Sequence, residues 1–150
     1  MNDIAELRLE IHADDDGTAD LIATVSGHGF AGNGSAWFNI EELRRFASDI
    51  AQYPLDDPVS LAGGYWSKTS PGCLETIKVS IRVYLISGRG QLGIRVRAFQ
   101  PSHTRDSSDA NHGVELELQT TYNRLDRFSR DLVDVLDGKT PYARIEEEIL

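Results

Sequence analysis

One eight-residue pattern occurs twice in the chain, as Leu43-Arg-Arg-Phe-Ala-Ser-Asp-Ile50 and as Leu125-Asp-Arg-Phe-Ser-Arg-Asp-Leu132. Both copies read Leu-x-Arg-Phe-small-x-Asp-aliphatic, and their apolar residues recur at the spacing of an amphipathic helix. Each helix follows two alternating segments joined by a turn and then one further strand. The pattern therefore predicts two β-β-β-α units that arose by duplication; the alternative is that two amphipathic helices simply reuse common residues.

The first predicted unit spans residues 1–54. Apolar and polar residues alternate from Ala5 to Ile11 and again from Leu21 to Val25. The turn Asp14-Asp-Asp-Gly17 separates these segments, so they are expected to form an antiparallel hairpin.

A glycine-rich loop is expected at 27–34, followed by a short strand at Ala36–Phe38. Asn39 suits the N-cap of the first helix, since its side-chain oxygen can accept a backbone N–H bond, and Glu42 is placed as in a capping box. Pro54 ends the unit.

The second predicted unit spans residues 74–138. Its strands are expected around Ile77–Leu85, Leu92–Phe99 and Val114–Leu118, and its helix ends near Gly138.

If the second and third strands of this unit are neighbours, Arg95 and Arg97 would face Glu115 and Glu117 across them.

Residues 55–73 are expected to form a linker, with a short strand at Val59–Leu61 and a loop from Gly63 onward. Residues 139–150 are expected to form a charged tail that is either a short helix or frayed. The resulting fold class is α+β, a single domain in which an antiparallel β-sheet is covered on one side by two helices with pseudo-twofold symmetry.

The formal net charge is −9, with 24 acidic and 15 basic residues. An acidic chain disfavours nucleic-acid binding, which needs clustered Lys and Arg, and it permits a basic protein partner. Cys73 is the single cysteine, so the fold needs no internal disulfide. With neither a secretion signal nor an apolar stretch of about 20 residues, the expected location is the cytoplasm, away from any membrane.

The candidate metal and catalytic motifs are all incomplete. Asp14, Asp16, Gly17 and Asp20 only partly resemble a calcium loop, so a hairpin turn is the better interpretation. His103 and His112 share a polar segment with Asp106 and Asp109, which leaves a weak metal site open.

His12, His28 and Cys73 belong to no recognised ligand or nucleophile spacing. Gly27-x-Gly-x-x-Gly32 lacks the β-α-β context of a dinucleotide site. We therefore predict no catalytic residues, no metal site and no cofactor.

Three aromatic residues, Trp37, Tyr65 and Trp66, are the candidate protein contacts. Tyr and Trp are favoured at interfaces because they bury a large area with little loss of entropy. The alternative is that they cover the edge of the core.

The layout resembles small bacterial immunity proteins of the WapI type. The residues that carry the resemblance are Gly34-x-x-Trp-Phe38 running into the Leu43–Ile50 helix, and the Ile77–Phe99 hairpin followed by Val114–Leu118 and Leu125–Leu136. The resemblance implies a non-catalytic inhibitor that binds and neutralises a toxin, and it carries over no functional residue.

The sequence thus predicts a non-catalytic protein-binding module, immunity-like and directed at a basic partner. The alternative is a small-molecule or metal-ion binding protein that uses the loops at 27–34 and 102–113. Exposed edge strands would also allow two copies to pair into a homodimer.

Overall fold

The computed structural model describes residues 4–100 and 112–150. The elements follow one another as three strands, a helix, four strands, a second helix and a last strand. In order they are β1 (Glu6–Ala13), β2 (Thr18–Gly27), β3 (Phe30–Asn39), α1 (Ile40–Asp49), β4 (Val59–Trp66), β5 (Leu74–Leu85), β6 (Leu92–Gln100), β7 (His112–Thr120), α2 (Tyr122–Leu136) and β8 (Tyr142–Glu146).

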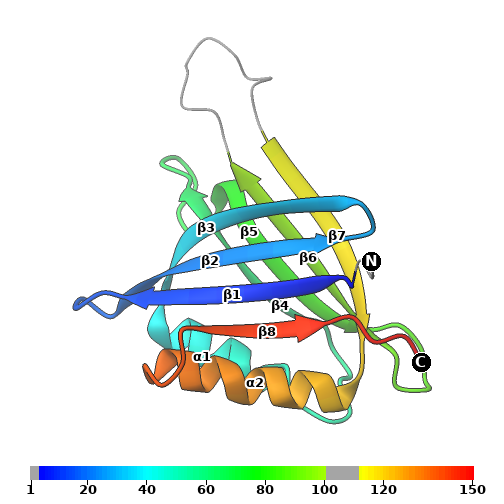
Figure 1. The fold of residues 1–150 in the computed structure, drawn as a ribbon. Coiled ribbons are helices and arrows are strands. Elements are labelled where there is room, and N and C mark those ends of the chain that lie inside the picture. Colours follow the sequence, from blue (N-terminus) through cyan, green and yellow to red (C-terminus); the bar gives the residue numbers. More distant parts are fainter. Residues whose placement is uncertain (1–3, 101–111) are drawn as a thin grey trace.

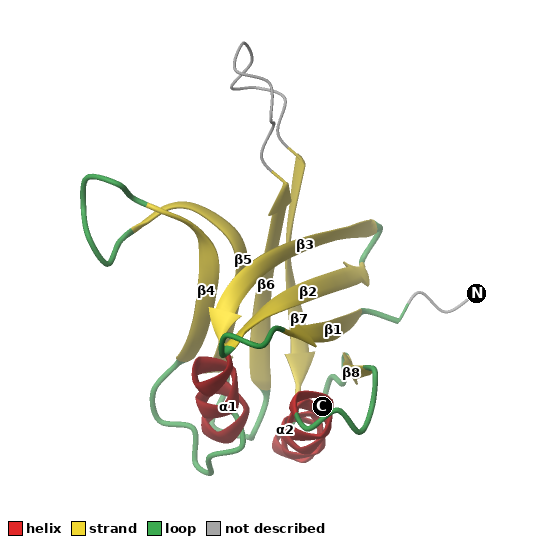
Figure 2. Ribbon diagram, turned by 90° about the vertical axis from the view of Figure 1, so that its left-hand side faces the viewer, coloured by secondary structure: helices red, strands yellow, loops and turns green. Residues whose placement is uncertain are grey.

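The strands form two antiparallel sheets, which confirms the predicted α+β class but divides the predicted single sheet in two. Sheet A has the order β3-β2-β1-β8 and sheet B the order β4-β5-β6-β7. The sheets face each other, and α1 and α2 lie side by side at one end of the space between them (Figures 1 and 2). The core fills this space.

Each helix is followed by a strand that joins the sheet of the other unit. β4, which follows α1, pairs with β5 in sheet B, and β8, which follows α2, pairs with β1 in sheet A. Both sheets therefore contain three consecutive strands and one contributed strand, in the same succession. Duplication of a β-β-β-α-β unit would produce this strand order. The duplication itself stays a prediction.

The expected linker and tail are thus parts of the sheets. The predicted loop is confirmed for residues 67–72 but was wrong for Gly63 to Trp66, which continue β4 and pair with β5 through two register shifts. A Cβ atom at Gly64 would collide with the carbonyl oxygen of Thr76, so the glycine permits this irregular pairing. The tail likewise contains β8, with Ala143 and Ile145 in the core.

The third strand is longer than predicted, because the glycines of 27–34 are not a loop. His28 and Gly29 form a tight turn with positive φ angles of 55° and 85°, and β3 then begins at Phe30. Gly34 faces sheet B, where a Cβ atom would lie 2.9 Å from the carbonyl oxygen of Lys78. Glycine is used here to bring two backbones close together.

The two copies of the repeated pattern lie on α1 and α2 and contact each other. Leu43, Phe46, Ala47 and Ile50 are buried in the first copy, and Leu125, Phe128, Ser129 and Leu132 in the second. The small residue of one copy contacts the small residue of the other: the Ser129 hydroxyl donates a hydrogen bond of 2.5 Å to the carbonyl of Ala47. Equivalent positions therefore lie together at the helix contact.

The start of α1 differs from the prediction. Asn39 is the N-cap residue, but its side chain makes no capping hydrogen bond. Instead the backbone N–H of Ile40 donates to the carbonyl of Gly17, at 3.0 Å, in the turn between β1 and β2. A tertiary contact thus satisfies one of the N–H groups left free at the helix start.

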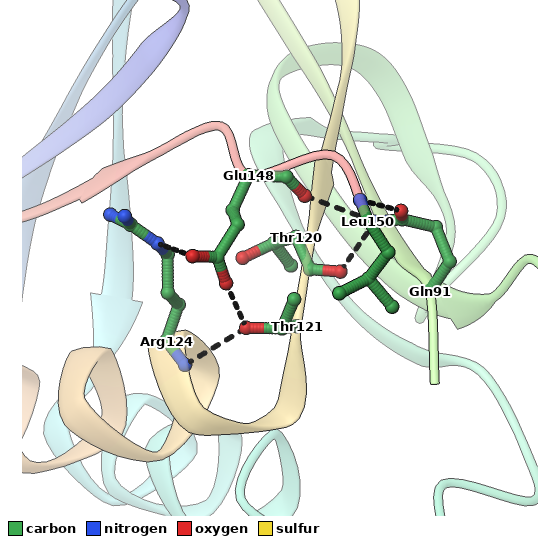
Figure 3. A network of polar contacts seen from close by, with 6 residues as sticks. All are labelled: Gln91, Thr120, Thr121, Arg124, Glu148 and Leu150. Atoms are coloured by element: carbon green, nitrogen blue, oxygen red, sulfur yellow. Dashed lines mark hydrogen bonds and ion pairs between the residues drawn. The ribbon is translucent and has the colours of Figure 1, made fainter. Parts of the chain in front are cut away.

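The residues after β8 tie the two sheets together through Gln91 (Figure 3). The side-chain amide of Gln91 donates to the carbonyls of Thr120 (2.7 Å) and Glu148 (3.1 Å), and its oxygen accepts from the N–H of Leu150 (2.8 Å). Glu148 also accepts a hydrogen bond of 2.7 Å from the hydroxyl of Thr121, the N-cap residue of α2. The chain end is an ordered part of the fold.

Candidate protein-binding surface

All three predicted contact residues are exposed. Trp37 on β3 has 57% of its surface exposed, and Tyr65 and Trp66 at the end of β4 have 46% and 59%. About half of the surface of each residue faces water and is available for a partner, and the other half is covered by the protein.

Trp66 lines an open groove of about 610 Å³ at the start of α1. The turn between β1 and β2 contributes Gly17, and the end of β3 contributes Asn39. The remaining lining residues are Glu41, Glu42 and Arg45 of α1. The groove thus brings the end of β4 next to the first turns of α1.

Trp37 lies beside this groove, and Tyr65 points elsewhere. Trp37 is two residues from Asn39 on the outer face of β3, where it is paired with Asp20 of β2. The ring of Tyr65 instead contacts Lys78, whose Nζ lies 5.1 Å from the ring centroid. Trp66 therefore lines the groove, Trp37 lies on β3 two residues from its lining residue Asn39, and Tyr65 contacts Lys78 on sheet B.

Carboxylates dominate the charge of this surface. Glu41 and Glu42 occupy the first turn of α1, where the helix dipole favours negative charge. In the adjoining turn, the side-chain and backbone hydrogen bonds from Thr18 hold the pKa of Asp16 below its usual value, so this carboxylate is ionised at neutral pH. We use the name aromatic-acidic groove for the lining residues Gly17, Asn39, Glu41, Glu42, Arg45 and Trp66 together with Trp37, which is exposed two residues before Asn39.

The groove offers two kinds of contact to a cation. Its carboxylates can accept charge-assisted hydrogen bonds from Lys or Arg, and the faces of Trp37 and Trp66 can take a cation–π contact. Tryptophan gives the strongest such contact among the aromatic residues. The sequence identified the rings but missed Glu41, Glu42 and Arg45, because they read only as the first turns of a helix.

The predicted hairpin turn at Asp14 to Gly17 is confirmed. Ala13 pairs with Ala19, and Asp16 accepts hydrogen bonds from both the backbone and the hydroxyl of Thr18. Within residues 4–100 and 112–150, no three His, Cys, Asp or Glu side chains are grouped as metal ligands.

The histidines and the cysteine are dispersed. His12 lies on β1, 3.7 Å from a carboxylate oxygen of Glu10, and His28 lies 3.2 Å from Glu147. His112 begins β7, and Cys73 is exposed just before β5. His103, Asp106 and Asp109 lie outside the described residues.

The two segments of the alternative ligand-binding prediction meet in part. Residues of 27–34 and the described end of 102–113 line one hollow of about 190 Å³. Its lining residues are Ala31, Gly32, Asn33, Ala98, Gln100, His112, Gly113 and Val114. This volume is below the roughly 300–1,000 Å³ of typical small-molecule sites, so the aromatic-acidic groove is the better candidate.

Comparison of the chain with protein-family models, curated proteins and solved structures gives no match. None of the helices in the described part of the chain is both long and apolar enough to span a bilayer.

Proposed function

We propose that the chain is a non-catalytic protein-binding module that holds a basic segment of its partner in the aromatic-acidic groove. The observation that carries the proposal is the exposure of Trp66 beside the carboxylates of Glu41 and Glu42, with a second exposed tryptophan, Trp37, two residues before Asn39 of the groove. Exposed tryptophans near negatively charged carboxylates are the composition expected of an interaction hot spot for a positively charged segment.

The layout resemblance to WapI-type immunity proteins supports an inhibitor as the kind of binding module. An inhibitor needs a surface that fits its target and no chemistry of its own. The proposed setting is the cytoplasm, as the sequence predicts, where such a module would neutralise a basic toxin before it acts.

The test is affinity capture from the native host with the wild-type chain and with a Trp37→Ala/Trp66→Ala variant. One specific basic protein should be retained by the wild type and lost by the variant. Phe30→Ala is the control, because Phe30 is 64% exposed but lies at the β2–β3 turn, outside the groove. If the wild type retains no specific protein, or the double variant retains it equally, the proposal is wrong.

A further inference from the structure

The outer face of sheet B concentrates positive charge in an acidic protein. Alternate residues of β5 and β6 point away from the core, since Val79, Ile81, Val83, Ile94 and Val96 between them are buried. The outward residues include Lys78 and Arg82 on β5 and Arg95 and Arg97 on β6. Four of the 15 basic residues thus lie on two adjacent strands, although the chain carries a net charge of −9.

The strand register arranges this face in two rows that run across the sheet. One row is Ser60, Arg82, Arg95 and Glu117, and the next is Ala62, Ser80, Arg97 and Glu115. Acidic residues therefore flank the arginines only on the β7 side. On the β4 side Arg82 faces Ser60, which has no charge to offer it.

The available carboxylates are already committed to Arg95. Its guanidinium lies 3.0 Å from Glu115 and 3.6 Å from Glu117. Glu117 also accepts a hydrogen bond from the hydroxyl of Tyr84. The pKa of Tyr84 is raised, mainly by burial and to a lesser extent by this hydrogen bond. Tyr84 is therefore protonated at neutral pH and remains the donor.

In the part of the chain that the structure describes, Arg82 and Arg97 have no carboxylate partner. Among residues 4–100 and 112–150, Arg82 forms neither an ion pair nor a hydrogen bond through its side chain, and Arg97 only lies over the ring of Phe99, 5.8 Å from its centroid. Arg82 is also directly opposite Arg95, and like charges in that position destabilise a sheet. A carboxylate from outside the chain would relieve this repulsion.

We propose that the outer face of sheet B binds an acidic, extended segment of a partner protein, with carboxylates on Arg82 and Arg97. These arginines are diagonal neighbours, a relation that typically spaces residues about 7–8 Å apart. Side chains two residues apart in an extended peptide are spaced about 6.8 Å. A segment of the form acidic-x-acidic therefore matches the two sites, and Lys78 with Tyr65 would border it.

Charge complementarity on this limited area favours a peptide over nucleic acid. Strong phosphate-backbone binding requires many neutralised phosphates, whereas this face offers only a few unpaired cations in a chain of net charge −9. A short acidic peptide can make the same local contacts with the arginines. It carries fewer negative charges than a nucleic acid, so the acidic protein repels it less. The site is separate from the aromatic-acidic groove.

The test is fluorescence anisotropy with a labelled peptide of alternating Glu and Ser. The wild-type chain should bind it, more weakly as salt is raised, and Arg82→Glu/Arg97→Glu should weaken binding by about tenfold or more. Arg127→Glu/Arg130→Glu is the matched control, because it makes the same change of net charge on exposed positions of α2. Circular dichroism checks that both variants are folded.

Three outcomes would overturn the proposal. The first is no peptide binding by the wild type, or equal loss in the control variant. The second is tighter binding of a DNA duplex than of the peptide. The third is self-association in sedimentation velocity that Arg82→Glu/Arg97→Glu abolishes, which would make a second copy the occupant. Trp37→Ala/Trp66→Ala should bind the peptide normally, so this test and that of the proposed function fail independently.

Discussion

At the residue scale, Gln91 shows how one buried amide can join distant parts of a chain. Only 7% of its surface is exposed, and its donor and acceptor groups are all directed at the backbone of Thr120, Glu148 and Leu150. A buried polar side chain is stable only when such groups are satisfied. Truncating it would leave these backbone groups to find other partners.

We expect Gln91→Ala to lower the free energy of unfolding by about 1–3 kcal/mol, the cost of leaving buried polar groups unpaired. Urea denaturation followed by circular dichroism measures this change. Gln52→Ala is the control, because Gln52 is exposed and makes one marginal side-chain bond of 3.5 Å to Asp49. Equal midpoints for the two variants would show that the chain end adds no stability through Gln91.

At the scale of elements, the helix contact explains the small residue in the repeated pattern. Ala47 is fully buried and meets Ser129 of the other copy. A larger side chain at either position would push the helices apart and disturb the adjoining core. Phe46 and Phe128, the neighbouring pattern positions, pack into that core.

We therefore expect Ala47→Leu to lower the free energy of unfolding by about 1–3 kcal/mol, the usual cost of an overpacked core. Ser48→Leu introduces the same side chain one position along, where the helix is exposed, and should change stability little. Thermal and urea unfolding of the two variants gives the comparison. A Ser48→Leu variant as unstable as Ala47→Leu would contradict the helix contact.

Periodicity predicted the elements whose signal is local. The β1–β2 and β5–β6 hairpins and both helices carry clear apolar patterns, and the expected facing of Arg95 and Arg97 with Glu115 and Glu117 is confirmed. Opposite charges on the two strands indicated this facing, and the structure adds which arginine is opposite which glutamate.

Two strands depend on distant partners: the sequence predicted only the Val59–Leu61 part of β4, and it missed β8. β4 contains Gly63 and Gly64, and β8 has only five residues, so neither has a strong pattern of its own. Each becomes a strand by pairing with the first strand of the other unit. The groove has the same origin: Trp66 and Glu42 are far apart in sequence and are brought together by the path of β4.

At the scale of the whole molecule, β4 and β8 each join the sheet of the other unit. As a result, the two chain ends lie at the position that the turn between β4 and β5 has in the other sheet. β4 and β5 are joined through residues 67–73, and the corresponding pair, β8 and β1, carries the two termini. The segments that lead to the two ends are in contact, since the N–H of Glu147 donates to the carbonyl of Ala5 at 2.8 Å. If the two units are copies, the chain can be opened at either place.

We expect a circular permutant that begins at Pro71, with residues 150 and 1 joined by a glycine-serine linker, to fold as the original does. Its element order would again be three strands, a helix, four strands, a helix and a last strand, because β4 and β8 exchange roles. The new ends fall at exposed turn positions, where interruption is best tolerated. Cooperative unfolding and an unchanged circular dichroism spectrum are the readouts. A permutant that stays unfolded while its linker-free parent folds would refute the equivalence of the two units, because both chains can form the same set of strand pairs.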